Sequence, residues 1–136
     1  MSIDFGLKIF LMLSDNTAIN SPLIYLKSLK ELKAKQRKFS SKKKAKLELA
    51  KFHIKLANQR KDYFFKLASY LAKKYDNVFI EDLNLKVMAK IWGRKINDLA
   101  FNKFINILIN KTNVVKIDKF YPSSKTCSYC GYIKKI

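Results

Sequence analysis

The segment SIDFGLKIFLMLSDN, residues 2–16, decides the fold that we expect for this chain. It is rich in Ile, Phe and Leu, with Gly6 near its start and the polar residues 14–16 at its end. Apolar runs separated by turn-forming residues predict a strand, a tight turn and a second strand. Residues 17–21 can add a short third strand, which Pro22 ends.

The next part of the chain, residues 23 to about 75, contains no Gly or Pro and is helical in character. A break at Ser40 and Ser41 predicts two helices in a hairpin. The second helix, residues 42–75, would run about 50 Å at 1.5 Å per residue. Its 3–4 spacing predicts one apolar face, which Lys61 interrupts. The members of this face are Leu47, Ala50, Ile54, Ala57, Phe64, Ala68, Leu71 and Tyr75.

After the helical region, strand and helix signals alternate. Residues 78–80 form an apolar run that predicts a buried strand with Glu81 at its carboxyl end. Asn97 is the predicted N-cap of a helix, whose apolar side is Phe101, Phe104, Ile105, Leu108 and Ile109. Residues 113–120 predict one more strand. The order of these elements predicts an α/β domain with a mixed sheet.

The chain carries a formal net charge of +19, which favours a polyanionic partner, most simply nucleic acid. The charge is densest in a basic tract that contains a single acid, Glu31. Like charges packed this closely repel one another unless an anion lies beside them. The alternative is a solvated helix face enriched by coding bias, since only 3 of the 29 basic residues are Arg. The basic tract consists of Lys27, Lys30, Lys33, Lys35, Arg37, Lys38, Lys42, Lys43, Lys44 and Lys46.

Two acids lie on separate predicted strands in an otherwise apolar setting. Asp4 falls on the first strand and Glu81 at the end of a later one. Acids from two strands can converge on a divalent cation, and Mg²⁺ prefers oxygen ligands of this kind. The alternative is that each is a strand-end acid that faces water.

The two cysteines, Cys127 and Cys130, form a Cys-x-x-Cys turn followed by Gly131. This spacing is typical of half a zinc site, while a redox pair and inert thiols are the alternatives. The apolar run at residues 9–13 is too short for a signal peptide or a membrane span. We therefore expect a cytoplasmic protein that is neither secreted nor bound to a membrane.

Four segments closely resemble the transposon-encoded TnpB/OrfB family, in the family's order and across essentially the whole chain. They are SIDFGLK, LANQRKDYFFKLASYLAKKYDN, NVFIEDLNLKVMAK and KIDKFYPSSKTCSYCGYIKK. The family resembles RNA-guided DNA nucleases, and its catalytic half is RuvC-like with an RNase H fold and an inserted zinc module. The resemblance implies a RuvC-like core at residues 1–122, with a helical insertion at about 23–75. Residues 123–136 would be the first half of the zinc finger.

The resemblance also implies roles for individual residues. Asp4 would be the first and Glu81 the second catalytic acid of a Mg²⁺ site, and Cys127 and Cys130 would hold half of a Zn²⁺ site. The helical pair would lie against guide RNA and target DNA.

The sequence departs from the family pattern in three places. We expect it to lack the family's amino-terminal region, its second Cys-x-x-Cys and the Arg-Asp-x-Asn-Ala-Ala segment that carries the third acid. The chain would then be a fragment truncated at both ends and inactive alone, with self-association through exposed apolar edges. The alternatives are a non-enzymatic RNA- or DNA-binding fragment and a functionless remnant.

Overall fold

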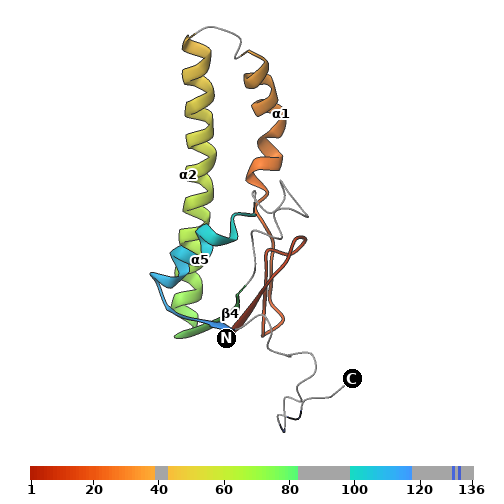
Figure 1. Ribbon diagram of the computed structural model, residues 1–136, viewed down its shortest axis with the longest axis vertical. Helices are drawn as coiled ribbons and strands as arrows, with labels where there is room; N and C mark the ends of the chain where they lie inside the picture. Colours follow the sequence, from red (N-terminus) through yellow and green to blue (C-terminus); the bar gives the residue numbers. More distant parts are fainter. Residues whose placement is uncertain (39–42, 83–98, 118–129, 131, 133–136) are drawn as a thin grey trace.

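The computed structural model describes residues 1–38, 43–82, 99–117, 130 and 132 of the chain. Within them the elements follow the predicted order, as Figure 1 shows. The mixed α/β architecture is therefore confirmed for the described residues. The elements are β1 (Ser2–Phe5), β2 (Leu11–Leu13), β3 (Ala18–Ile19), α1 (Ile24–Arg37), α2 (Lys43–Lys74), β4 (Asn77–Glu81), α5 (Phe101–Ile109) and β5 (Asn113–Ile117).

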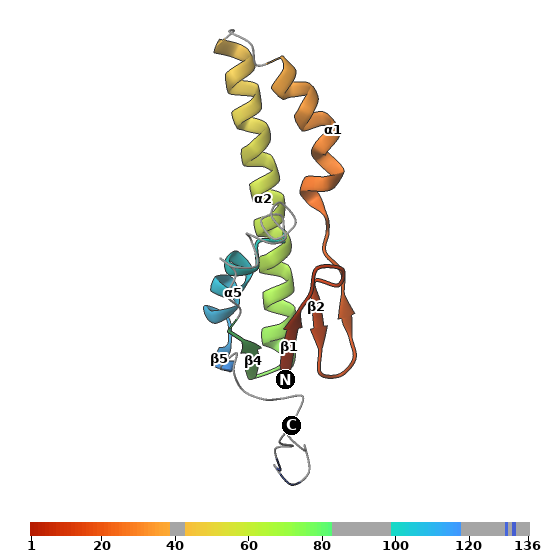
Figure 2. The ribbon, with the colours of Figure 1, turned by 45° about the vertical axis from the view of Figure 1, so that its right-hand side comes forward.

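The strands form one sheet in the order β3-β2-β1-β4-β5 (Figure 2). β1 pairs antiparallel with β2, and β2 with β3, whereas β4 lies parallel to β1 and β5 parallel to β4. The β1–β2 turn requires a glycine, because a Cβ on Gly6 would lie 2.7 Å from the carbonyl oxygen of Ile9. The turn that the sequence predicted is thus built around this close approach.

One face of the sheet carries the main core. Alternation along the strands places Ile3, Phe5, Val78 and Ile80 on this face, where each is buried. The second half of α2 and the whole of α5 pack against them. Phe10 lies at the centre, with its ring stacked on Phe64 at 5.6 Å and on Phe101 at 5.4 Å between centroids. This aromatic cluster joins the β-hairpin to both helices.

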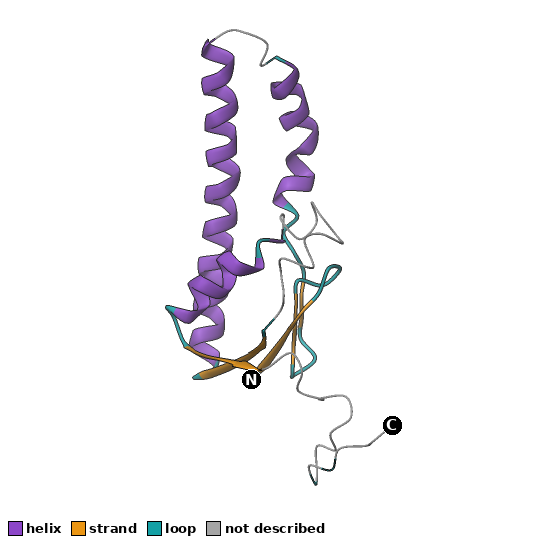
Figure 3. Cartoon of the chain, in the orientation of Figure 1, coloured by secondary structure: helices purple, strands orange, loops and turns teal. Residues whose placement is uncertain are grey.

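α1 and α2 form the predicted hairpin, which extends away from the sheet (Figures 1 and 3). A second, smaller cluster joins the two helices and buries Leu32, Phe52 and Leu56. The apolar face predicted for the first half of α2 is wrong: Leu47 and Ile54 are 55% and 59% exposed, and Ala50 and Ala57 are also exposed. The reason is that α1 packs on Phe52 and Leu56, which are buried. At 100° per residue these two lie nearly opposite Leu47 and Ile54 on α2.

α5 also differs from its prediction in two details. The helix begins at Phe101, with Ala100 at the N-cap in a left-handed conformation at φ 48°. Asn97 is therefore not the cap of this helix, and it lies outside the described residues. Phe101, Phe104, Ile105 and Leu108 are buried as predicted, but Ile109 is 47% exposed. It follows Leu108 directly, so the 100° step per residue turns it away from the core.

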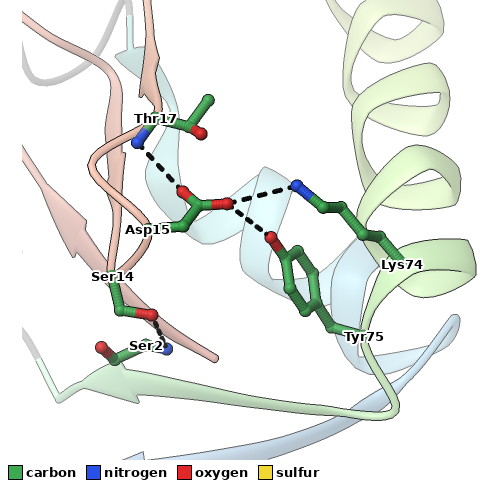
Figure 4. A network of polar contacts seen from close by, with 6 residues as sticks. All are labelled: Ser2, Ser14, Asp15, Thr17, Lys74 and Tyr75. Atoms are coloured by element: carbon green, nitrogen blue, oxygen red, sulfur yellow. Dashed lines mark hydrogen bonds and ion pairs between the residues drawn. The ribbon is translucent and has the colours of Figure 1, made fainter.

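A polar network ties the β2–β3 turn to the end of α2 (Figure 4). The Asp15 carboxylate accepts hydrogen bonds from the Thr17 amide at 3.0 Å, the Tyr75 hydroxyl at 2.8 Å and the Lys74 ammonium at 3.2 Å. Hydrogen bonds from Thr17 and Tyr75 hold the pKa of Asp15 below its usual range. The Tyr75 hydroxyl and Asp15 raise the pKa of Lys74 in turn.

Some predictions fall outside the described residues. These are the break at Ser40 and Ser41, the side chains of Lys42 and Cys127, and most of residues 123–136. Across the described ranges, no helix is both long enough and apolar enough to cross a membrane.

Candidate functional site

Asp4 and Glu81 lie beside each other on the face of the sheet opposite the core. Ile3 of β1 pairs with Ile80 of β4 in parallel register, so the next residue along each strand brings Asp4 beside Glu81. Neighbouring strands are about 4.8 Å apart. Both acids alternate with buried neighbours, and both are exposed. The structure therefore brings together the two acids that the sequence singled out.

The surroundings of this acidic pair are apolar on one side. Phe79, Val115 and Ile117 are 37–39% exposed, and Ile117 is the β5 partner of Glu81. Asp82 does not join the pair, because its carboxylate lies 3.7 Å from the Lys116 ammonium and its amide donates to the Ile117 carbonyl at 3.0 Å. This fits the expectation that the side chain after Glu81 points away from the pair.

Adjacent carboxylates on an open face supply the hard oxygen ligands that Mg²⁺ prefers, and they leave room for a phosphate to approach. In the part of the chain that the structure describes, no group of three or more acids, histidines or cysteines is positioned to hold a metal ion. The pair can therefore provide two ligands of a metal site within these residues.

Part of the basic tract forms a charged stripe on α1. Lys27, Lys30, Lys33 and Arg37 are all exposed, and their 3–4 spacing places them on the outer face of the helix. We call these residues the α1 basic face. At 1.5 Å rise per residue the face extends about 15 Å, which is enough to follow a nucleic-acid backbone over several phosphates.

The rest of the basic tract is divided among other positions. Lys35 is half-buried, lying 3.8 Å from Glu31 and 5.4 Å from the centroid of the Phe52 ring. Lys38, Lys44 and Lys46 are exposed near the tip of the hairpin. Lys43 is the first residue of α2, and Lys42 lies outside the described residues. The tract is therefore not one continuous surface, and Lys35 belongs to the contact between the helices.

The cysteine pair is only half described. Cys130 is exposed and forms no disulfide among the described residues. Cys127 lies outside them. The zinc half-site therefore stays a prediction.

Sequence reasoning missed a second group of cations. Lys61 and Lys111 each place their ammonium 5.8 Å from the centroid of the Phe65 ring. Lys61 and Lys103 also line a groove between α2 and α5. The one feature of the sequence that could have indicated these cations was Lys61, a charged residue in the middle of the predicted apolar face.

Comparison with known proteins gives consistent matches. A candidate RNA-guided DNA endonuclease of Streptomyces pristinaespiralis is 28% identical over 148 residues, which cover 98% of this chain and 37% of that protein. The TnpB-like protein L79 of Acanthamoeba polyphaga mimivirus is 33% identical over 112 residues, covering 71% of this chain and 21% of the viral protein. The candidate RNA-guided DNA endonuclease InsQ of Escherichia coli K12 is 24% identical, covering 99% of this chain and 40% of InsQ.

The chain spans less than half the length of each of these relatives. A family model described as a probable transposase, OrfB_IS605, matches residues 1–92. This match covers more than half of the chain and agrees with the resemblance carried by the four sequence segments. The chain therefore belongs to the TnpB/OrfB family of transposon-encoded proteins.

Proposed function

We propose that the chain is the RuvC-like part of an RNA-guided DNA endonuclease, in which Asp4 and Glu81 hold a divalent metal for phosphodiester hydrolysis. The single observation that carries the proposal is the register of β1 and β4, which sets the two acids side by side on an open sheet face. The mixed sheet, with a helical hairpin between β3 and β4, supports the RNase H-like fold that the resemblance implies.

The donor set suits Mg²⁺ or Mn²⁺, since both acids offer hard oxygen ligands and both are exposed. A bound ion would supply charge stabilisation and orientation for phosphate oxygens. The chain's own contribution is to fix the two carboxylates on neighbouring strands of a packed sheet. Ile3 and Ile80, the buried residues just before them, anchor that register in the core.

The α1 basic face supports nucleic acid as the partner, DNA or a guide RNA. Its four cations follow one exposed helix face, and electrostatic binding of this kind does not depend on sequence. The same observation favours a second candidate function, a basic RNA- or DNA-binding fragment without catalysis. The zinc half-site at Cys127 and Cys130 and a cytoplasmic location stay predictions.

The first test of this function is metal binding at the acidic pair. Mn²⁺ titrated into isotopically labelled chain should broaden the amide signals of Asp4 and Glu81 before those of the helices. The Asp4→Asn, Glu81→Gln variant should lose this selective broadening. Asp62→Asn is the matched control, because Asp62 is an exposed acid on α2 that lies 2.8 Å from the Lys66 ammonium. Equal broadening in the parent and the double variant would show that the pair holds no metal.

The second test is cleavage of single-stranded and duplex DNA in Mg²⁺ or Mn²⁺. We expect at most trace nicking, because the resemblance assigns the third catalytic acid to an Arg-Asp-x-Asn-Ala-Ala segment that the sequence does not contain. A missing ligand costs more than a misplaced one, and a misplacement of about 1 Å already costs roughly a hundredfold. Robust cleavage that disappears in Asp4→Ala, Glu81→Ala would contradict this expectation and would place catalysis in the chain itself.

A further inference from the structure

A groove of about 320 Å³ lies where α5 crosses α2. Its rim carries three cations, Arg60, Lys61 and Lys103, and the two amides Asn58 and Asn106. Its floor is apolar and includes Phe64 and Ile107 from the core side of the two helices. None of the described residues that line it is acidic.

A pair of lysines continues this positive charge beside the groove. The Phe65 ring is 39% exposed, and the ammoniums of Lys61 and Lys111 both lie 5.8 Å from its centroid. Attraction to the ring face holds each cation in place. Lys61 belongs to both features, so the groove and the Phe65 cations form one surface on α2, α5 and the residues just after α5.

Three lysines are gathered around the groove and the Phe65 ring. Within the described residues Lys61, Lys103 and Lys111 form no ion pair, so no carboxylate neutralises them there. Clustered like charges repel one another, and an anion placed between them removes this cost. The groove is therefore suited to a ligand that carries phosphates and also an apolar surface.

We propose that this groove binds one nucleotide of a single-stranded nucleic acid, with the flanking phosphates at Lys61, Lys103 and Lys111. The volume lies at the small end of the range for ligand pockets, about 300–1,000 Å³. That size suits a nucleotide whose base lies on the apolar floor, whereas a duplex offers only its backbone to such a groove. Phe65 is a positioning residue that holds two of the ammoniums, and Asn58 and Asn106 can donate to the base or the sugar.

The proposal goes beyond the endonuclease function and does not depend on it, since single-strand binding needs neither a metal nor a guide. It also concerns a surface separate from the α1 basic face. Failure of the cleavage tests would leave it standing, and its own failure would leave the acidic pair unaffected.

The test compares two variants that lower the net charge equally. Lys61→Gln, Lys103→Gln, Lys111→Gln changes the groove, while Lys8→Gln, Lys55→Gln, Lys73→Gln changes exposed lysines elsewhere. Binding of labelled oligothymidine, oligouridine and a DNA duplex is measured between 50 and 200 mM salt, the range in which phosphate contacts are resolved. All six side chains are exposed, so both variants should fold, which circular dichroism and thermal unfolding check.

The salt slope is the slope of the logarithm of the binding constant against the logarithm of the salt concentration. For single strands the groove variant should lower its magnitude by about 2, since three phosphate contacts contribute roughly 0.7 each. Over a fourfold change of salt this equals a difference of about 18-fold in affinity. The control variant should change the slope much less, and duplex binding should be affected less than single-strand binding. Equal losses in the two variants would overturn the site, and equal losses for duplex and single strand would overturn the single-strand assignment.

A photo-crosslink gives an independent readout. An oligonucleotide with one bromouracil should attach to peptides from residues 57–65 or 103–111. The oligothymidine and oligouridine measurements distinguish DNA from RNA as the source of the strand. Crosslinks confined to α1 would overturn the proposal.

Discussion

Neutralising the α1 basic face should flatten the salt dependence of nucleic-acid binding by a calculable amount. The perturbation is Lys27→Gln, Lys30→Gln, Lys33→Gln and Arg37→Gln, four exposed positions on one face of α1. If each contacts one phosphate of a duplex, the log–log slope falls by about 3.6, at roughly 0.9 per contact. Over a fourfold change of salt this equals a difference of about 150-fold in affinity. Gln keeps the helix propensity, so α1 itself should persist.

The assay is fluorescence anisotropy with a labelled DNA duplex at several salt concentrations. The matched control is Lys8→Gln, Lys51→Gln, Lys55→Gln and Lys73→Gln, which lowers the net charge by the same four units at other exposed positions. The α1 variant should show the flatter slope and the control a slope near that of the parent. Equal slopes for the two variants would refute the α1 face as the interface and would leave only a general effect of charge.

The remaining predictions concern the scaffold that carries these surfaces. Gly6→Ala should lower the free energy of unfolding by about 2 kcal/mol, because its Cβ would meet the Ile9 carbonyl at 2.7 Å; an unchanged urea midpoint would contradict this. Phe10→Ala should lower the free energy of unfolding by about 3–5 kcal/mol. Phe65→Ala should lower it far less, because the Phe65 ring is 39% exposed. Asp15→Asn should destabilise the chain at neutral pH, where the hydrogen-bonded carboxylate has a lowered pKa. The difference in unfolding free energy between parent and variant should be full above about pH 4, the ordinary pKa range of the carboxyl group. It should shrink as the pH falls further, because the stability that a lowered folded-state pKa contributes is lost as the carboxylate becomes protonated.

The parts of the structure that the sequence predicted well depend on local signals. Apolar runs predicted the strands that carry Asp4 and Glu81. The prediction that residues 78–80 are all buried is wrong at Phe79, which is 38% exposed because alternate side chains of β4 point to the face opposite the core. β1 and β4 are parallel neighbours, so their register decides whether Asp4 lies beside Glu81. That register is set by the packing of Ile3 and Ile80 into one core. Sequence reasoning therefore singled out the two acids and the possibility that they converge, but it did not give the strand register that sets them side by side.

The parts that the sequence could not predict depend on contacts between distant segments. A helical period fits more than one stripe of residues on α2, and which stripe is buried depends on the side on which α1 packs, at Phe52 and Leu56. Leu47 and Ile54 were assigned to the buried stripe for this reason and are exposed. The groove at Lys61 and Lys103 forms because α5 packs against α2, although the two segments are some forty residues apart in the sequence. Local sequence patterns do not predict a contact between such distant segments.

The α1 basic face, which we expect to bind nucleic acid, lies apart from the acidic pair, which we expect to bind the metal. α2 has 32 residues, which is about 48 Å at 1.5 Å per residue, and only its second half packs on the sheet. The hairpin therefore carries the α1 basic face away from the sheet, as Figures 1 and 2 show. Loss of charge on α1 should weaken nucleic-acid binding and leave metal binding at Asp4 and Glu81 unchanged. Conversely, Asp4→Asn, Glu81→Gln should abolish metal binding while the salt slope stays that of the parent. A metal site that responded to the α1 substitutions would contradict this separation, because no described contact joins the α1 basic face to the sheet face that carries the acids.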